Sequence, residues 1–97
     1  MVHGHETFYL KGVNYSHDLA ECVVRSVVTG TGWRNRGARP NNTFGVLRGN
    51  RHRPAVLVEY DFISNALRER ELADKLTQYK LAELTYNGIM EFINEGW

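Results

Sequence analysis

A continuous apolar run, Ala55–Val58, is the clearest feature in the pattern of hydrophobic and polar positions along the chain. A run this rich in β-branched residues is typical of a strand that is buried on both faces, as in a parallel sheet. Pro54 suits the first position of that strand, where one ladder donor can be spared. Glu59 follows where the run stops. It therefore lies at the carboxyl end of the predicted strand, where open α/β sheets usually hold their sites.

The stretch after Ser16 predicts a helix. Ser16 is a candidate N-cap, and Asp18 adds a favourable negative charge in the first turn. Apolar residues recur at helical spacing as far as Val28, and Gly30 and Gly32 are expected to end the helix.

A second helical pattern begins near Ala66, with Ser64 or Asn65 as its N-cap, and continues to about Asn94 with a break near Asp74. Its apolar positions predict one stripe: Leu72, Leu76, Tyr79, Ala82, Tyr86, Ile89 and Ile93. Gly88 lies within this helix at a cost of about 1 kcal/mol relative to alanine, which indicates close packing there.

The remaining segments are short. Glu6–Leu10 predicts a strand, and Thr43–Leu47 predicts another. Gly30–Asn42 and Arg48–Arg53 are expected to be exposed basic loops. A chain of 97 residues allows one small domain. We therefore expect an α/β fold, with a parallel or mixed sheet flanked by helices.

Charge is distributed unevenly, although the net charge is only +1. Residues 1–58 hold eight Lys/Arg and three Asp/Glu, whereas residues 59–97 hold four and eight. The single cysteine, Cys22, excludes an internal disulfide and suits a small buried position. We find no charged-then-apolar leader and no apolar run of membrane-spanning length, so we expect no membrane partner and assign no compartment.

The acid-free stretch between Glu21 and Glu59 contains a group of arginines that allows three interpretations. They are solvated loop residues, some of which pair with the acidic C-terminal helix; they recognise carboxylates; or they bind nucleic acid, with Trp33 and Phe44 as stacking residues. We rank nucleic acid last, because the total charge is low and no nucleic-acid-binding motif is present. The arginines are Arg34, Arg36, Arg39, Arg48, Arg51 and Arg53.

Glu59 itself has two interpretations: a strand-end carboxylate in water or paired with an arginine, or a catalytic acid/base with a tuned pKa. The segment Val58–Asn65 resembles the Leu/Val-x-Glu-x-Gly-Phe-Ile/Leu-Ser-Asn signature of zinc-dependent N-acetylmuramoyl-L-alanine amidases, and this favours the second interpretation. Other segments follow the order of that family: Gly4–Tyr9, Ser16–Ala20, Arg36-Gly37, Phe44–Arg48, Pro54–Glu59, Leu81-Ala82 and Gly88-Ile89.

The resemblance implies that residues 1–97 form the C-terminal part of a three-layer α/β/α catalytic domain of a peptidoglycan hydrolase. It implies Glu59 as the catalytic carboxylate, with Arg48, Glu6 and Asn65 as substrate-binding residues. The family's Zn²⁺ is held by a His, a Glu and a second His that precede the Gly-x-Glu-x-Tyr strand. Because this chain begins at that strand, we expect no metal ligands in it and no stoichiometric zinc in the isolated chain. His3 and His5 are considered as replacement ligands and not adopted.

The expected partners are peptidoglycan and either a complementary N-terminal half or a second copy of the chain, because a half-domain leaves a sheet edge unpaired. The alternative function is a non-catalytic accessory module that binds wall fragments or a full-length amidase. Asp61 stands where the family usually has Gly, and its charge is expected to raise the pKa of Glu59.

Overall fold

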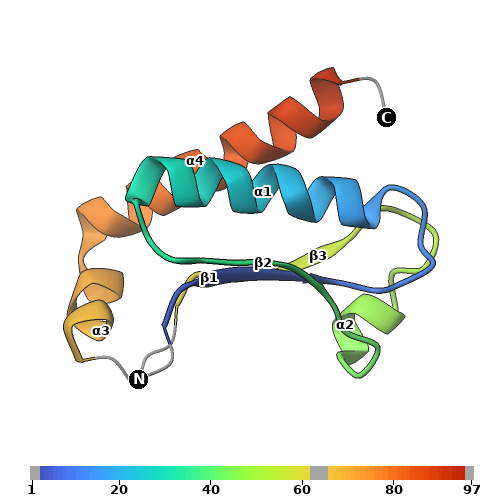
Figure 1. Ribbon diagram of the computed structural model, residues 1–97, viewed down its shortest axis with the longest axis horizontal. Coiled ribbons are helices and arrows are strands. Elements are labelled where there is room, and N and C mark those ends of the chain that lie inside the picture. The colour runs from blue at the N-terminus through green and yellow to red at the C-terminus, as the bar shows by residue number, and fades with distance from the viewer. Residues whose placement is uncertain (1–2, 62–65, 96–97) are drawn as a thin grey trace.

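The computed structural model describes residues 3–61 and 66–95. It is an α/β fold in which helices flank a three-stranded mixed sheet of order β2-β1-β3 (Figure 1). The predicted N-caps Ser64 and Asn65 lie outside the described residues. In chain order, the elements are β1 (His5–Tyr9), α1 (Ser16–Thr31), β2 (Asn35–Pro40), α2 (Gly45–Arg48), β3 (Val56–Glu59), α3 (Ala66–Ala73) and α4 (Lys75–Asn94).

The central strand β1 pairs with β2 in parallel and with β3 in antiparallel orientation. The prediction that β3 is buried on both faces in a parallel setting is therefore wrong. All four of its residues are only partly buried, because within the described residues β3 pairs on one side alone. The antiparallel direction has a consequence for chemistry: it brings the end of β3 to the beginning of β1.

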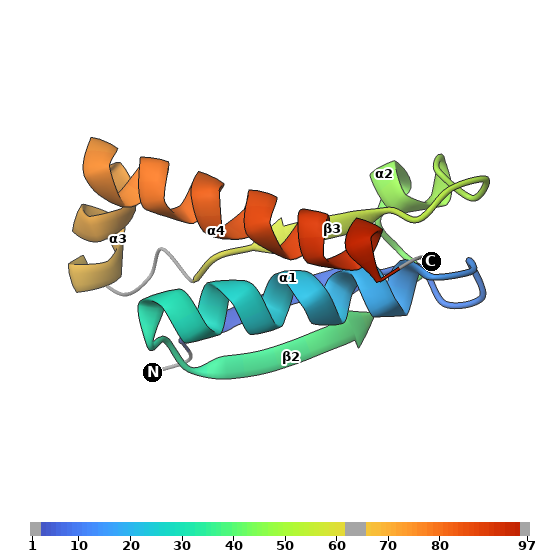
Figure 2. The same cartoon turned by 90° about the horizontal axis from the view of Figure 1, so that it is seen from above.

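Helices α1 and α4 lie side by side in opposite directions and cover the same face of the sheet (Figures 1 and 2). The helical pattern after Ser16 is confirmed, since its apolar stripe is buried, and Cys22 is buried as expected. The core joins this stripe to Leu81 and Phe92 of α4, with Val56 and Val58 of β3 packed against it.

Gly88 is a point of close backbone approach between the two helices, which confirms the packing predicted there. A Cβ atom on Gly88 would lie 2.8 Å from the Cα atom of Val23 and 2.9 Å from the carbonyl oxygen of Cys22. Both are backbone atoms, which cannot move aside as a side chain can. Gly30, predicted to end α1, lies inside the helix, where a Cβ would meet only the side chain of Leu84. The helix ends at Thr31, and Gly32, the other predicted terminator, is its C-cap with φ 72°.

The stripe predicted on α4 is wrong in its direction. The side chains that face α1 are those of Leu81, Leu84 and Phe92, whereas most of the predicted stripe is exposed. The break at Asp74 is confirmed, because the Asp74 side chain accepts a 3.0 Å hydrogen bond from the backbone N–H of Thr77 and caps α4. Residues of the exposed stripe are Leu76, Tyr79, Tyr86, Ile89 and Ile93.

Three local predictions are wrong, because side chains or strand pairing provide hydrogen bonds to the backbone that the sequence pattern did not indicate. Ser16 is the first residue of α1, after Tyr15 in a left-handed conformation, and its hydroxyl accepts a 3.2 Å hydrogen bond from the Ala55 N–H. The expected loop 30–42 contains β2, which β1 holds in the sheet. The expected strand 43–47 contains α2 instead, preceded by a turn in which Asn41 accepts hydrogen bonds from the backbone N–H groups of Thr43 and Phe44.

None of the helices within the described residues combines the length and the apolar character that a membrane span needs.

Candidate functional site

Glu59 ends β3 directly opposite Glu6 of β1, its register partner. Val58 and Tyr60 pack toward the core under the helices, so the alternation of a strand directs Glu59 to the other face of the sheet. Partners that are directly opposite in an antiparallel pair point to the same face, so the two carboxylates share that face. The structure thus brings together two of the predicted site residues, Glu59 and Glu6.

Glu6 is only 5% exposed and is paired with two arginines of β2. Its Oε2 atom lies 3.5 Å from Nε of Arg36 and 3.2 Å from Nε of Arg39. These two arginines therefore pair with the neighbouring strand β1. One interpretation of the sequence expected some of the arginines to pair with the acidic C-terminal helix instead. The arginine that meets Glu91 of α4 is Arg25 of α1, which is not one of the six arginines named from the sequence.

The environment of Glu59 raises the pKa of its carboxyl group above the ordinary value. Burial is the largest cause, because it penalises the charged form, and the negative charge of Glu6 is the second. Arg36 acts in the opposite direction, and Asp61 adds a smaller increase. The predicted direction of the Asp61 effect is confirmed, although Glu6 contributes more.

Asp61 is a structural anchor that sequence reasoning missed. Its side chain is buried, accepts a 2.8 Å hydrogen bond from the backbone N–H of Gly4, and pairs with Nε of Arg68 at 2.6 Å. Arg68 also binds both oxygens of Glu71 at 3.0 Å and stacks 4.2 Å above the ring of Trp33. The network ties α3 and the start of β1 to the end of β3 that carries Glu59. Of the contacts in this network, the sequence could have indicated only the Arg68–Glu71 pair, through its i, i+3 spacing on a helix.

His5 is fully buried beside this network. Its Nε2 atom lies 3.0 Å from the hydroxyl of Thr7, and its ring lies against that of Tyr60. Burial lowers the pKa of His5 to about 4, while a backbone hydrogen bond to Tyr60 and the charge of Asp61 act in the opposite direction. The side chain is a neutral core residue at neutral pH.

We expect the stability of the protein to fall on acidification because of His5. The folded-state pKa of about 4 lies below the ordinary value of 6.5, so between these values the unfolded chain takes up a proton that the folded chain does not. His5 should contribute a loss of roughly 2 kcal/mol in the free energy of unfolding between pH values of about 7 and about 4.5.

Urea denaturation at the two pH values measures this contribution. On acidification, His5→Gln should lose less free energy of unfolding than the parent protein does. His17→Gln, at an exposed residue that contacts Glu21, should lose as much as the parent. Equal pH dependence in His5→Gln and the parent would contradict the assignment.

The described residues near Glu59 do not fit a zinc ion by themselves. Among residues 3–61 and 66–95, one set of three His, Cys, Asp or Glu side chains has its ligand atoms within 4.8 Å of one another: Cys22, Glu91 and Glu95. That set lies between α1 and α4, and the Arg25 guanidinium already contacts all three side chains. A metal at the Glu59 end of the sheet would need ligands from outside these residues.

Arg48 lies at the opposite end of the sheet from Glu59. It is exposed, in the last turn of α2, beyond the end of β2 (Figure 1). The structure therefore does not bring Arg48 and Glu59 together. Asn65, the remaining predicted substrate-binding residue, lies outside the described residues.

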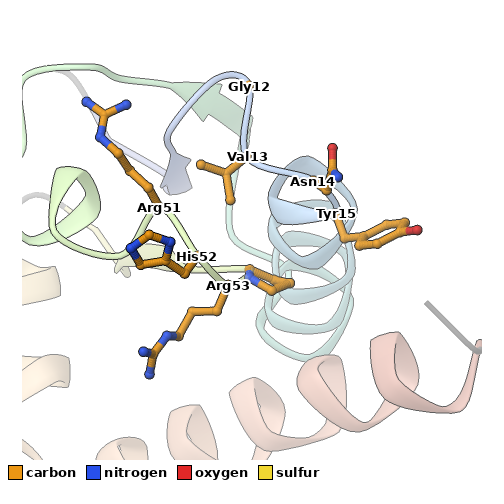
Figure 3. Close-up of a pocket in the computed structure, with 8 residues that line it drawn as sticks. Gly12, Val13, Asn14, Tyr15, Arg51, His52 and Arg53 are labelled. Atoms are coloured by element: carbon orange, nitrogen blue, oxygen red, sulfur yellow. The ribbon is translucent and has the colours of Figure 1, made fainter.

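A pocket of about 420 Å³ also lies at that far end, between the loop that follows β1 and the loop that precedes β3 (Figure 3). Arg51, His52 and Arg53 line it, but the two guanidinium groups point to different sides. Because the cationic groups diverge and Glu59 is at the other end of β3, we place the candidate chemistry at Glu59 and not in this pocket.

The two aromatic residues considered for base stacking both have protein partners. The ring of Trp33 packs against the core and under Arg68. The ring of Phe44 meets that of Phe8 edge-on at 5.2 Å. Neither ring is a free stacking platform.

Comparison with known proteins places this sheet and its carboxylates in a family. The family model described as N-acetylmuramoyl-L-alanine amidase matches residues 1–91. The chain therefore belongs to the N-acetylmuramoyl-L-alanine amidase family. An uncharacterized cell wall amidase of Bacillus anthracis is 35% identical over 98 residues, which cover 93% of this chain and 18% of that protein.

Solved structures of amidases share the fold. The CwlD amidase of Clostridioides difficile, solved in complex with the GerS lipoprotein, superposes with a TM-score of 0.90 at 29% identity, over 96% of this chain and 47% of that chain. The catalytic domain of CwlV from Paenibacillus polymyxa gives a TM-score of 0.83 at 33% identity, over 96% and 50%. The chain thus spans about half the length of these two solved relatives. The family is in general zinc-dependent.

Proposed function

We propose that the chain is part of a peptidoglycan amidase catalytic domain in which Glu59 transfers protons during cleavage of the amide bond between the lactyl group of muramic acid and L-alanine. The observation that carries this proposal is the setting of Glu59: a partly buried carboxyl group with a raised pKa at the end of β3, in a chain of this family.

In amide hydrolysis, water adds to the carbonyl carbon, the C–N bond breaks, and the leaving nitrogen gains a proton. A positioned carboxylate can accept the proton from the water and then donate it to the nitrogen. A pKa nearer to neutral suits both steps, because the group must gain and lose a proton in each cycle. Glu59 is a candidate for this role.

Zn²⁺ is the proposed cofactor by family. It would polarise the carbonyl group, and its ligands are expected from outside residues 3–61 and 66–95. The proposed partners are therefore peptidoglycan and a complementary segment that carries the ligands. Self-association through the edge of β3 that pairs with no strand among the described residues is the alternative way to cover that edge.

Reconstitution tests the function. The chain is mixed with the segment of a homologous amidase domain that the match does not cover, with zinc present, and new amino termini released from purified peptidoglycan are counted. We expect release by the mixture, neither half being active alone, and loss of activity with a chelator. Formation of a stable complex without release would favour the accessory-module function instead.

A further inference from the structure

Two carboxylates face each other across β1 and β3, an arrangement that sheets usually avoid. Like charges directly opposite in an antiparallel pair are destabilising. Glu6 and Glu59 are such a pair, and Glu6 is buried. A fold that retains this pair must balance at least one of the charges.

The balance is unequal. Both Arg36 and Arg39 place Nε within 3.5 Å of Oε2 of Glu6, so its carboxylate is held by two ion pairs. Among the residues that the structure describes, Glu59 makes no ion pair or hydrogen bond through its side chain. Two acids that share a site but have different surroundings can take different roles in proton transfer.

Other charged groups near Glu59 do not replace Glu6 in this role. Asp61 is held by Arg68 and the Gly4 N–H, and its effect on the pKa of Glu59 is the smallest of those resolved. His5, on the other face of β1, is neutral at neutral pH. Arg36 is the positive charge that opposes protonation of Glu59.

We propose that Glu6, fixed by Arg36 and Arg39, is the positioning residue for Glu59, and that its negative charge, facing Glu59 across the two strands, favours the protonated form of the Glu59 carboxyl group. The inference rests on the proposed function of Glu59, but it concerns a different residue and a property that the chain has without substrate. It also links two segments of the family resemblance: Arg36-Gly37 supplies one of the arginines that hold Glu6, and Gly4–Tyr9 supplies Glu6 itself.

The proposal is tested by following the Glu59 carboxyl carbon by NMR during a pH titration of this chain. In Glu6→Gln, the opposing charge is removed and two arginines remain, so the titration of Glu59 should move to lower pH. In Arg39→Gln, the charge of Glu6 is less balanced, so the titration should move to higher pH. Each pKa unit corresponds to a tenfold change in proton affinity.

Glu21→Gln is the matched control, because it removes one acid from the exposed surface of α1. It should leave the titration of Glu59 unchanged. Arg39→Gln changes a half-exposed side chain, so it serves if Glu6→Gln does not fold. Movement in opposite directions in the two test variants supports the proposal, and so does an upward shift in Arg39→Gln alone if Glu6→Gln is unfolded.

An unchanged titration in the folded test variants, or the same shift as in the control, overturns the proposal. The readout needs no second half and no substrate, so its failure is separate from failure of the reconstituted activity. If the reconstituted domain released no amino termini but the titration of Glu59 still shifted as expected in the test variants, the proposed function of Glu59 would be rejected. The effect of Glu6 on the proton affinity of Glu59 would still hold.

Discussion

Replacing Glu59 with glutamine is expected to reduce the rate of amide hydrolysis by the reconstituted domain by roughly 10²–10⁴-fold, the usual loss when a general acid–base group is removed. Glutamine keeps the size and most of the hydrogen bonding of the side chain but cannot carry the proton. Release of amino termini from peptidoglycan measures the effect, with Glu69→Gln on α3 as a control for loss of one acid.

Folding of the Glu59→Gln variant should be unimpaired. The folded-state pKa of Glu59 is raised, so the folded chain binds this proton more tightly than the unfolded chain, and its ionisation destabilises the fold as the pH rises above the ordinary range. Removing the charge should leave stability at neutral pH equal or slightly higher. Near-parental activity would reject the catalytic assignment, and an unfolded variant would identify Glu59 as a structural residue.

Replacing Asp61 with asparagine should destabilise the fold by about 3 kcal/mol, because it removes one partner of a buried ion pair and leaves the Arg68 guanidinium with less compensation. Asparagine can still accept the hydrogen bond from the Gly4 N–H, so the decrease in stability measures the contribution of the Asp61 charge. The free energy of unfolding from urea denaturation is the measurement.

Glu71→Gln is the control for Asp61→Asn. It removes the other carboxylate that contacts the same arginine, but at a partly exposed position where an ion pair contributes less than about 1 kcal/mol. If both variants lost the same stability, the Asp61–Arg68 pair would not be the anchor that we describe.

The sequence predicted those elements whose own residues determine them. The valine-rich stripe of α1 and the break near Asp74 are local signals, and both are confirmed. β2 was missed because its sequence, with arginines, glycine and proline, has low strand propensity, and its pairing with β1 overrides that preference. The buried face of α4 was missed because periodicity alone does not say which of two apolar stripes meets a neighbouring helix.

The same division holds for the candidate site. Glu59 was found because it ends an apolar run and lies in a family signature, both of which are sequence features. Its apposition to Glu6 depends on an antiparallel register between residues 53 positions apart, and no pattern in the chain encodes that register. The Asp61–Arg68 anchor likewise depends on where α3 is placed in space.

The hydrogen bond between the Gly4 N–H and Asp61 also sets where an added polypeptide would lie. Asp61 is two residues beyond Glu59, so any segment joined before Gly4 would depart from the end of the sheet that carries Glu59. Since an extended chain spans about 3.3–3.6 Å per residue, a linker of a few residues would bring metal-binding side chains close to Glu59. Helix α4 ends at the far end of the molecule (Figures 1 and 2). A single-chain enzyme or a split reporter built on this fold should therefore be fused through its amino-terminal side.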